Sequence, residues 1–210
     1  MRSVPGSSAP GRGYLGRMLF GRRLSLRPLT IEDFAAWQEV RRRNADWLLV
    51  WEPKRVAGAP DPVESRDAFA IRCGARERER QLGTGYAYGI FLGDRFAGEI
   101  NLSIVQRGPF QSAYIGYWID EAHAGEGLMP EALVCMCRSA FEDLHLHRVQ
   151  ISIIPRNHAS RRVVEKLAIR DEGVAERYLE INGVWEDHVR YAMTAEEWDE
   201  RGEDLVKEWL

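Results

Sequence analysis

One short segment limits the architecture of this 210-residue chain more than any other. Residues 113–120, AYIGYWID, form an apolar run typical of a strand, and residues 128–144 carry apolar side chains at helical spacing. Between them stand Gly125 and Gly127. Glycine adopts positive φ at no steric cost, and a helix N-terminus presents unpaired N–H groups, so this strand–glycine–helix unit can cradle an anion. The same spacing is also compatible with a tight turn that binds nothing.

The loop departs from the two commonest nucleotide-binding patterns. The chain has no G-x-x-x-x-G-K-[ST], and Pro130 stands where the dinucleotide pattern G-x-G-x-x-G requires its third glycine. Anion binding would therefore depend on backbone N–H groups over residues 125–129. We expect this cradle to comprise Gly125, Glu126, Gly127, Leu128 and Met129.

The order of the remaining elements predicts the fold class. The expected strands are 22–29, 86–92, 95–105, 113–120, 147–154, 169–180 and 184–193, and the main expected helices are 61–81, 128–144 and 159–168. Antiparallel hairpins come first and β-α-β-α units follow, which predicts one α/β (α+β) domain with a mixed, mostly antiparallel sheet flanked by helices. We expect this domain over residues 21–198, after a basic tail (1–20) and before a helical tail (199–210).

Charge is distributed unevenly along the chain. The first 27 residues hold six arginines and no acidic residue, although the net charge of the whole chain is −3. The basic tail can contact RNA or simply be solvated, and both readings stay open. The acidic remainder argues against sequence-specific nucleic-acid binding and suits a cationic substrate.

Targeting and metal-binding signals are lacking in the sequence. No stretch approaches the roughly 18 apolar residues of a membrane span, so we expect no membrane association. Cys73, Cys135 and Cys137 form no C-x-x-C pair, which favours a reducing cytoplasm. His145 and His147 have no third ligand nearby, and we expect no metal site.

Four stretches jointly resemble the GNAT acetyltransferases, and most closely the branch that acetylates the N-terminal amine of ribosomal proteins, the ribosomal-protein-alanine N-acetyltransferases. These stretches are IGYWID (115–120), GEGLMPEAL (125–133), NHASRRVVEKL (157–167) and RYLEINGVWEDHVRYAMT (177–194). Three positions depart from the family pattern. Ala124 replaces the Arg or Gln that opens the pyrophosphate loop, Met129 replaces its last small residue, and Ala168-Ile169 replaces Gly-Phe.

The resemblance implies where acetyl-CoA, the co-substrate, would bind. Two central parallel strands, 113–119 and 148–154, would splay apart to admit it. The backbone of Tyr117, Trp118 and Ile119 would pair with the pantetheine amides, and the pyrophosphate would lie on the 125–129 loop. Asn157 and Ser160 match the family's N-x-x-S, whose side chains lie near the thioester, although both residue types also cap helices.

The resemblance also implies direct attack of an amine on the thioester in a ternary complex. The family's usual proton donor, a Tyr, falls on Val164, so we expect Ser160 to donate a proton to the leaving thiolate. Glu99 and Glu180 are the candidate bases, and each can equally be a solvated residue. Roughly a tenth of α-amines are already neutral at pH 7, against under a thousandth of lysines, so an enzyme for N-terminal amines needs only a weak base.

The expected function is therefore acetyl transfer from acetyl-CoA to the N-terminal α-amine of a protein, and a ribosomal protein is the expected acceptor. The alternatives are a small amine, an antibiotic or a lysine as acceptor, and a CoA-binding regulatory module without turnover. Trp47, Trp51, Glu52 and Trp185 are candidates for an acceptor groove. The sequence leaves the oligomeric state open.

Overall fold

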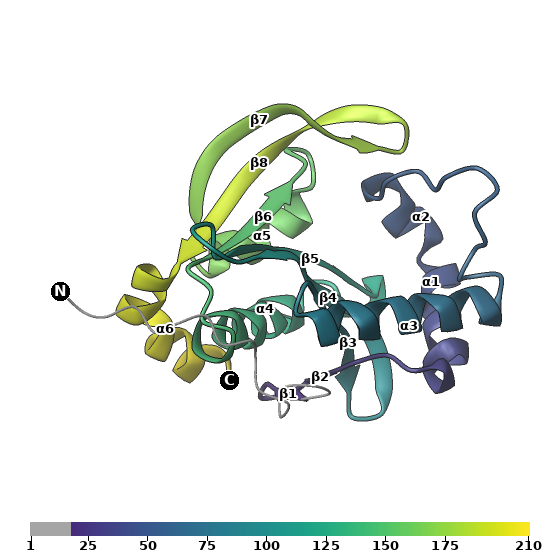
Figure 1. The fold of residues 1–210 in the computed structure, drawn as a ribbon, viewed down its shortest axis with the longest axis horizontal. Helices are drawn as coiled ribbons and strands as arrows, with labels where there is room; N and C mark the ends of the chain where they lie inside the picture. The colour runs from purple at the N-terminus through teal and green to yellow at the C-terminus, as the bar shows by residue number, and fades with distance from the viewer. Residues whose placement is uncertain (1–17) are drawn as a thin grey trace.

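The computed structural model describes residues 18–210, whose strands form one mixed sheet in the order β1-β2-β3-β4-β5-β6-β8-β7 (Figure 1). Within this part of the chain, β5 and β6 are the one parallel pair, and all other neighbours are antiparallel. The strands are β1 Leu19–Phe20, β2 Ser25–Arg27, β3 Tyr86–Leu92, β4 Arg95–Gln106, β5 Ser112–Ile119, β6 Arg148–Ile153, β7 Arg170–Ile181 and β8 Val184–Thr194. The mixed, mostly antiparallel α/β fold is as predicted.

Helices connect these strands and cover the sheet (Figure 1). The α-helices are α1 Phe34–Arg43, α2 Ala45–Leu48, α3 Arg66–Leu82, α4 Leu128–Arg138, α5 His158–Lys166 and α6 Ala195–Trp209. Short turns are η2 Ile31–Asp33, η3 Leu49–Trp51, η4 Glu121–His123 and a π-helical turn, η5 Ser139–Asp143. The β7–β8 hairpin arches over the top of the molecule toward α2 (Figure 1).

Two apolar clusters hold the helices on the sheet. The larger one surrounds α4, which is buried along its whole apolar length between the sheet and α6. The smaller one joins Trp37 of α1 and Phe69 of α3 to Phe91 and Phe96 of the β3–β4 hairpin. Because α4 is enclosed, the start of this helix is fixed in place, and the loop before it is held relative to the sheet.

Several predicted boundaries were wrong for local reasons. The helix expected from 61 begins at Arg66, because Asp61 accepts a hydrogen bond from the Val63 amide in a turn, and extended Ser65 caps the helix through the Ala68 amide. The helix expected to end at 144 is α-helical only to Arg138 and continues as the π-helical turn. The strand expected over 22–29 is limited to β2.

Both predicted tails contain residues that belong to the folded domain. Most of the predicted basic tail, residues 1–17, lies outside the described residues, and Leu19–Phe20 already pairs with β2. The predicted C-terminal tail is helical, as part of α6, and Leu205 is buried in the larger cluster. This packing makes residues 199–210 a structural part of the fold.

Candidate active site

The central strands separate and open a cleft. β5 pairs with β6 only at Ser112, Ala113 and Tyr114, and the remaining residues of β5 have no partner on that side within the described chain. The cleft has a volume of about 1360 Å³. The predicted splay of the parallel strands is confirmed, and it leaves the backbone of Ile115–Ile119 unpaired along one edge.

The glycine loop forms one end of this cleft. Gly125 and Gly127 have φ of 85° and 81°, and Gly127 is the N-cap of α4, which no side chain caps. Among the described residues, no acceptor receives a hydrogen bond from the N–H groups that lead into the helix. These free donors at a helix N-terminus fit a diphosphate group, because they combine unpaired N–H groups with a positive partial charge.

Most residues that the sequence predicted as cofactor-binding line the cleft together. They are Tyr117, Trp118, Ile119, Gly125, Gly127, Leu128, Met129, Asn157 and Ser160. Glu126 is the exception: its carbonyl oxygen accepts a hydrogen bond from Arg23, and its carboxylate contacts His123. Glu126 can therefore contribute its backbone N–H, whereas its side chain points to another partner.

A buried carboxylate supports the glycine loop from the N-terminal segment. Glu131 of α4 is 1% exposed and accepts hydrogen bonds from the Arg23 amide and side chain and from the Leu24 amide. Arg23 in turn donates to the Glu126 carbonyl at 2.9 Å. Since one arginine joins helix and loop, the first turn of α4 and the glycine loop are held as one unit.

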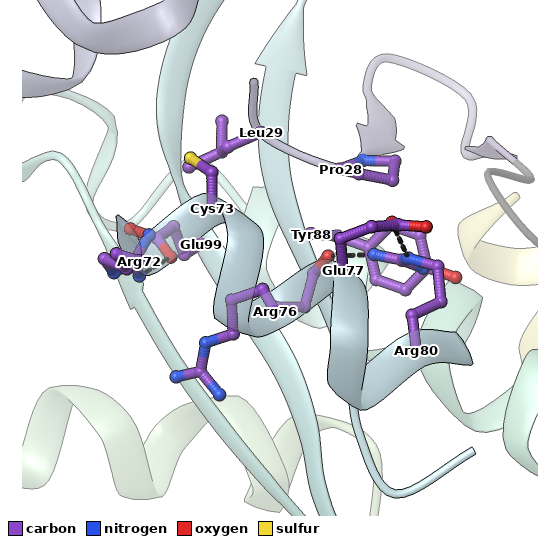
Figure 2. Close-up of a pocket in the computed structure, with 10 residues that line it drawn as sticks. Pro28, Leu29, Arg72, Cys73, Arg76, Glu77, Arg80, Tyr88 and Glu99 are labelled. Carbon is purple, nitrogen blue, oxygen red and sulfur yellow. Dashed lines mark hydrogen bonds and ion pairs between the residues drawn. The ribbon is translucent and has the colours of Figure 1, made fainter. Parts of the chain in front are cut away.

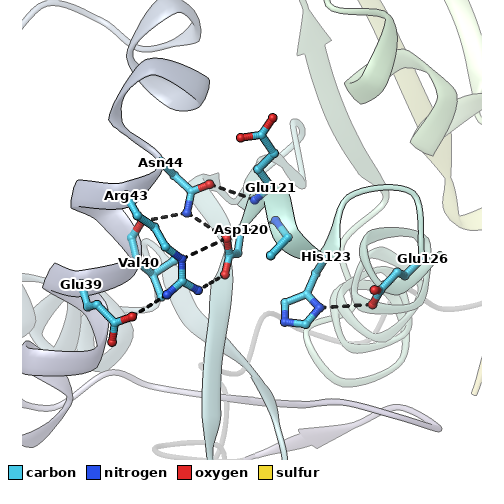
Figure 3. A network of polar contacts seen from close by, with 9 residues as sticks. Glu39, Val40, Arg43, Asn44, Asp120, Glu121, His123 and Glu126 are labelled. Carbon is cyan, nitrogen blue, oxygen red and sulfur yellow. Dashed lines mark hydrogen bonds and ion pairs between the residues drawn. The ribbon is translucent and has the colours of Figure 1, made fainter.

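A second polar network holds the other side of the loop (Figure 3). Asp120, which follows β5, is buried and accepts hydrogen bonds from Arg43, from Asn44 and from the Ala122 amide. Burial disfavours ionisation of Asp120, but the hydrogen bonds from Arg43 and Asn44 outweigh it and keep the pKa of this carboxyl below its usual range. Sequence reasoning missed this network because its members are more than 70 residues apart.

Ser160 and Asn157 occupy the start of α5, across the cleft from β5. The Asn157 side chain caps the helix by accepting the Ser160 amide at 3.1 Å. The Ser160 hydroxyl donates to the Tyr117 hydroxyl, also at 3.1 Å. Asn157 is thus a helix cap, as one reading of the sequence allowed, and Ser160 remains directed into the cleft beside Tyr117.

The two candidate bases lie in different surroundings. Glu99 of β4 is 1% exposed, lines the cleft, and accepts hydrogen bonds from Trp37 Nε1 and from Arg72. Figure 2 shows Glu99 and Arg72 at one end of a second, small cavity between α3 and the sheet. Glu180 is exposed on the β7–β8 hairpin, and it is absent from the described lining of the cleft. The structure thus brings Glu99 to the cleft and leaves Glu180 outside it.

The far end of the cleft is bridged by two loops. Trp47, Trp51 and Glu52 line this end, whereas Trp185 is 60% exposed and does not. The Asn182 amide at the tip of the β7–β8 hairpin donates to the Glu52 carbonyl at 3.1 Å. This contact joins Glu52, which follows η3, to the tip of the β7–β8 hairpin and bridges this end of the cleft, so an acceptor that enters here must pass beside the bridge.

The carboxylates that line the cleft are not free to bind a cationic substrate. Each carboxylate in the described lining is paired with an arginine: Glu52 with Arg41, Asp61 with Arg55, Glu64 with Arg42 and Glu99 with Arg72. Arg162 and Lys166 of α5 line the cleft and form no ion pair among the described residues. The cleft therefore offers unpaired positive charge, contrary to what the net charge suggested.

The structure offers neither a metal site nor a membrane span in the part described. No cluster of three or more His, Cys, Asp or Glu side chains in residues 18–210 is arranged to hold a metal ion. No helix there has the length and apolar character needed to cross a bilayer. Cys135 and Cys137 are buried packing residues, and burial raises the pKa of each thiol to about 12.

An open mixed sheet that separates between two parallel strands, with an uncapped glycine-led helix at the base of the gap, is the architecture of the CoA-dependent N-acetyltransferases. Comparison with known proteins gives the same class. Residues 23–170 match the family described as Acetyltransferase (GNAT) domain. The chain belongs to this family and is an acetyl-CoA-dependent N-acetyltransferase.

Particular relatives place the chain near the ribosomal-protein branch. It is 35% identical over 165 residues to "Probable N-acetyltransferase YjcK" of Bacillus subtilis, covering 78% of this chain and 89% of the relative. It is 33% identical over 172 residues to the [Ribosomal protein uS5]-alanine N-acetyltransferase of Escherichia coli, covering 80% and 87%. The structure of Mycobacterium smegmatis RimJ in complex with CoA-disulfide has a TM-score of 0.82 and 30% identity, covering 92% of this chain and 93% of that one.

Proposed function

We propose that this enzyme acetylates the N-terminal α-amine of a protein, with ribosomal proteins as the first candidates. The observation that carries the proposal is the continuous cleft from the uncapped glycine loop to the bridged opening between Glu52 and Asn182. The similarity to the uS5-alanine N-acetyltransferase supports the choice of acceptor. A chain terminus is thin enough to enter beside the bridge. A lysine on a folded surface is surrounded by other residues of its protein, and these would collide with the bridge.

The co-substrate end of the cleft supplies the binding groups for acetyl-CoA. The N–H groups over Gly125–Met129 would hold the pyrophosphate, and the backbone of Tyr117–Ile119 would pair with the pantetheine amides as an added strand does. Arg162 and Lys166 add unpaired positive charge on α5. These backbone and charge contributions compensate for Ala124, which lacks the side chain found at this position in the family pattern.

The acceptor amine must be neutral when it attacks the thioester carbonyl. We assign Glu99 as the group that receives its proton, directly or through water, because each carboxylate oxygen has a lone pair left after binding Trp37 or Arg72. A carboxylate is a weak base. A weak base suffices for an α-amine, since its pKa of about 8 leaves a useful neutral fraction at pH 7.

The leaving thiolate needs a hydrogen-bond donor on the opposite side of the reacting carbonyl. Ser160 takes this role in the proposal, because its hydroxyl faces the cleft and its position is fixed by the Asn157 cap. Acetyl-CoA supplies the activated acetyl group, and the protein contributes orientation, a proton acceptor and a donor to sulfur.

The charges in the cleft disfavour polycationic acceptors such as polyamines and aminoglycoside antibiotics. Such acceptors carry several positive charges and need carboxylates that are free to pair with them. In the described lining, Glu52, Asp61, Glu64 and Glu99 are all neutralised by arginines. An α-amine that enters in its neutral form avoids this penalty.

Mass spectrometry with matched peptides tests the proposal. The full chain is incubated with acetyl-CoA and peptides that begin with free Ala or Ser, with the same peptides blocked at the N-terminus but containing lysine, and with a polyamine. We expect a gain of one acetyl group on the free peptides and none on the blocked ones, with matching release of thiol. Acetylation of the blocked peptides or of the polyamine, or turnover on none of these acceptors, would overturn the assignment of the acceptor.

A further inference from the structure

A pair of hydroxyl groups spans the cleft between β5 and α5. Ser160 Oγ donates to the Tyr117 hydroxyl oxygen at 3.1 Å, and the Tyr117 hydroxyl donates to the Ser160 carbonyl oxygen at 3.1 Å. Both hydrogen bonds of the phenol therefore involve the same residue, 43 positions away in the chain. Tyr117 and Ser160 both line the cleft, so the pair lies at the surface that a bound thioester would reach.

The protonation state of Tyr117 is well defined. Burial raises the pKa of its phenol well above the ordinary value, and the hydrogen bond with Ser160 offsets this only partly. Tyr117 is thus a neutral hydroxyl near pH 7. A neutral phenol can donate one hydrogen bond while it accepts another.

The neighbouring helix position cannot supply a phenol in this chain. Val164, where the family resemblance places a Tyr, is 0% exposed and packs in the larger apolar cluster. Tyr117 brings a phenol to the start of α5 from β5 instead. This placement depends on the separation of β5 from β6, because the Tyr117 side chain reaches across that gap.

We propose that Tyr117 is a positioning residue for Ser160 in the acetyl transfer. The inference depends on the proposed role of Ser160. In the resting enzyme Tyr117 holds the Ser160 hydroxyl in one orientation. When Ser160 turns its hydrogen toward the leaving sulfur, the Tyr117 hydroxyl is near enough to turn from the Ser160 carbonyl to Oγ. A hydroxyl that accepts a hydrogen bond is a better donor, since linked hydrogen bonds polarise one another.

The proton balance requires no further reactant. The C–N bond forms as the amine attacks, the C–S bond breaks, and the electron pair of that bond leaves on sulfur. The amine passes one proton to Glu99, directly or through water, and the sulfur leaves as a thiolate that accepts the Ser160 hydrogen bond and then takes up a proton from water. Ser160 and Tyr117 both end as neutral hydroxyls, so each stabilises the leaving thiolate without a net change of its own.

A double-mutant cycle tests the coupling between the two hydroxyls. We expect Tyr117→Phe to lower kcat about tenfold, equivalent to about 1.4 kcal/mol of transition-state stabilisation, and to change the KM for acetyl-CoA less than about twofold. In a Ser160→Ala background the same substitution should change kcat less than about twofold, because its partner is gone. Equal losses of kcat in the two backgrounds, or wild-type kcat for Tyr117→Phe, would overturn the proposal.

Tyr191 of β8 provides a matched control, because its phenol contacts the same helix, α5. Its hydroxyl accepts a hydrogen bond from Arg161 of α5 at 3.1 Å, and Tyr191 does not line the cleft. Tyr191→Phe removes a phenol that supports α5 and should leave kcat unchanged. A loss of kcat as large as that of Tyr117→Phe would show that the effect is loosening of α5 and not positioning of Ser160.

A binding measurement separates this proposal from the choice of acceptor. Coenzyme A and each enzyme form are mixed in equal amounts, and the absorbance of the coenzyme A thiolate in the complex is followed against pH. Donors beside the sulfur stabilise the thiolate, so the bound thiol should titrate at lower pH in the unsubstituted enzyme than in Tyr117→Phe. Identical titrations would refute the role of Tyr117 whatever the acceptor, whereas failure of the peptide assay alone would affect only the proposed acceptor.

Discussion

The replacement of Asp120 by alanine tests how the fold holds the glycine loop. Asp120 stands between β5 and that loop, and its carboxylate binds Arg43, Asn44 and the Ala122 amide (Figure 3). Its side chain is 2% exposed, whereas the Arg43 side chain is 45% exposed. Removing the carboxylate therefore leaves one N–H of the buried Asn44 amide without its acceptor, although the same amide still donates to the Val40 carbonyl, while Arg43 can turn to water.

The size of the effect follows from these exposures. An unsatisfied buried donor costs about 1–3 kcal/mol, and loss of a charge-assisted hydrogen bond adds up to about as much again before resolvation of Arg43 is counted. We expect the free energy of unfolding to fall by about 2–4 kcal/mol. At about 3 °C per kcal/mol for a domain of this size, Tm should fall by roughly 6–12 °C.

The same arginine supplies an internal control. Arg43 also pairs with Glu39 at 2.6 Å, one turn earlier on α1, where the carboxylate side chain is 72% exposed. Glu39→Gln should cost no more than about 0.5 kcal/mol, because solvent screens an exposed pair. Urea and thermal denaturation of both variants measure the two losses of stability. Equal losses of stability in Asp120→Ala and Glu39→Gln would refute the argument that burial makes the Asp120 network important.

Two further predictions concern pH and the cleft. Because the pKa of Asp120 is lowered in the fold, its stabilisation is complete above the unfolded value of about 3.9 and is lost as pH falls through the lowered pKa. The stability difference between wild type and Asp120→Asn should thus be constant near neutral pH and shrink below about pH 4 in urea titrations; a constant difference throughout would contradict it. Gly116→Val adds a side chain where a Cβ meets nothing within 4 Å on the cleft wall, so Tm should be retained while calorimetric affinity for acetyl-CoA falls at least about tenfold. Gly127→Val should lose the same affinity and also about 1–2 kcal/mol of stability, because its φ is 81°; unchanged affinity in both variants would exclude this cleft as the binding site.

Features set by local geometry were predictable from the sequence. The Asn182-Gly183 hairpin formed as expected, with φ of 48° and 85°, because few residues other than Asn and Gly accept such angles in a two-residue turn. Gly125 and Gly127 adopt positive φ for the same reason. The order of strands and helices also followed, since apolar spacing of two or 3.6 residues is a property of short stretches of chain.

Pairings between distant side chains could not be predicted in this way. The sequence offered Glu99 and Glu180 equally as bases, and only the packing of α1 and α3 on β4 brings Trp37 and Arg72 to Glu99. Glu180 is exposed on the β7–β8 hairpin and is absent from the described lining of the cleft. The net charge was misleading as well, because the ion pairs that neutralise the cleft depend on which elements meet.

The amino-acid sequence by itself determined a mixed α/β sheet and a glycine-led helix that could bind an anion, because both depend on backbone preferences of neighbouring residues. The tertiary structure decided that Tyr117 meets Ser160 and that Asp120 meets Arg43 and Asn44. These residues are 43 to 77 positions apart and come together only through the strand order and the separation of β5 from β6. A side chain's partner across such a distance is set by packing of the whole domain, and no local pattern records it.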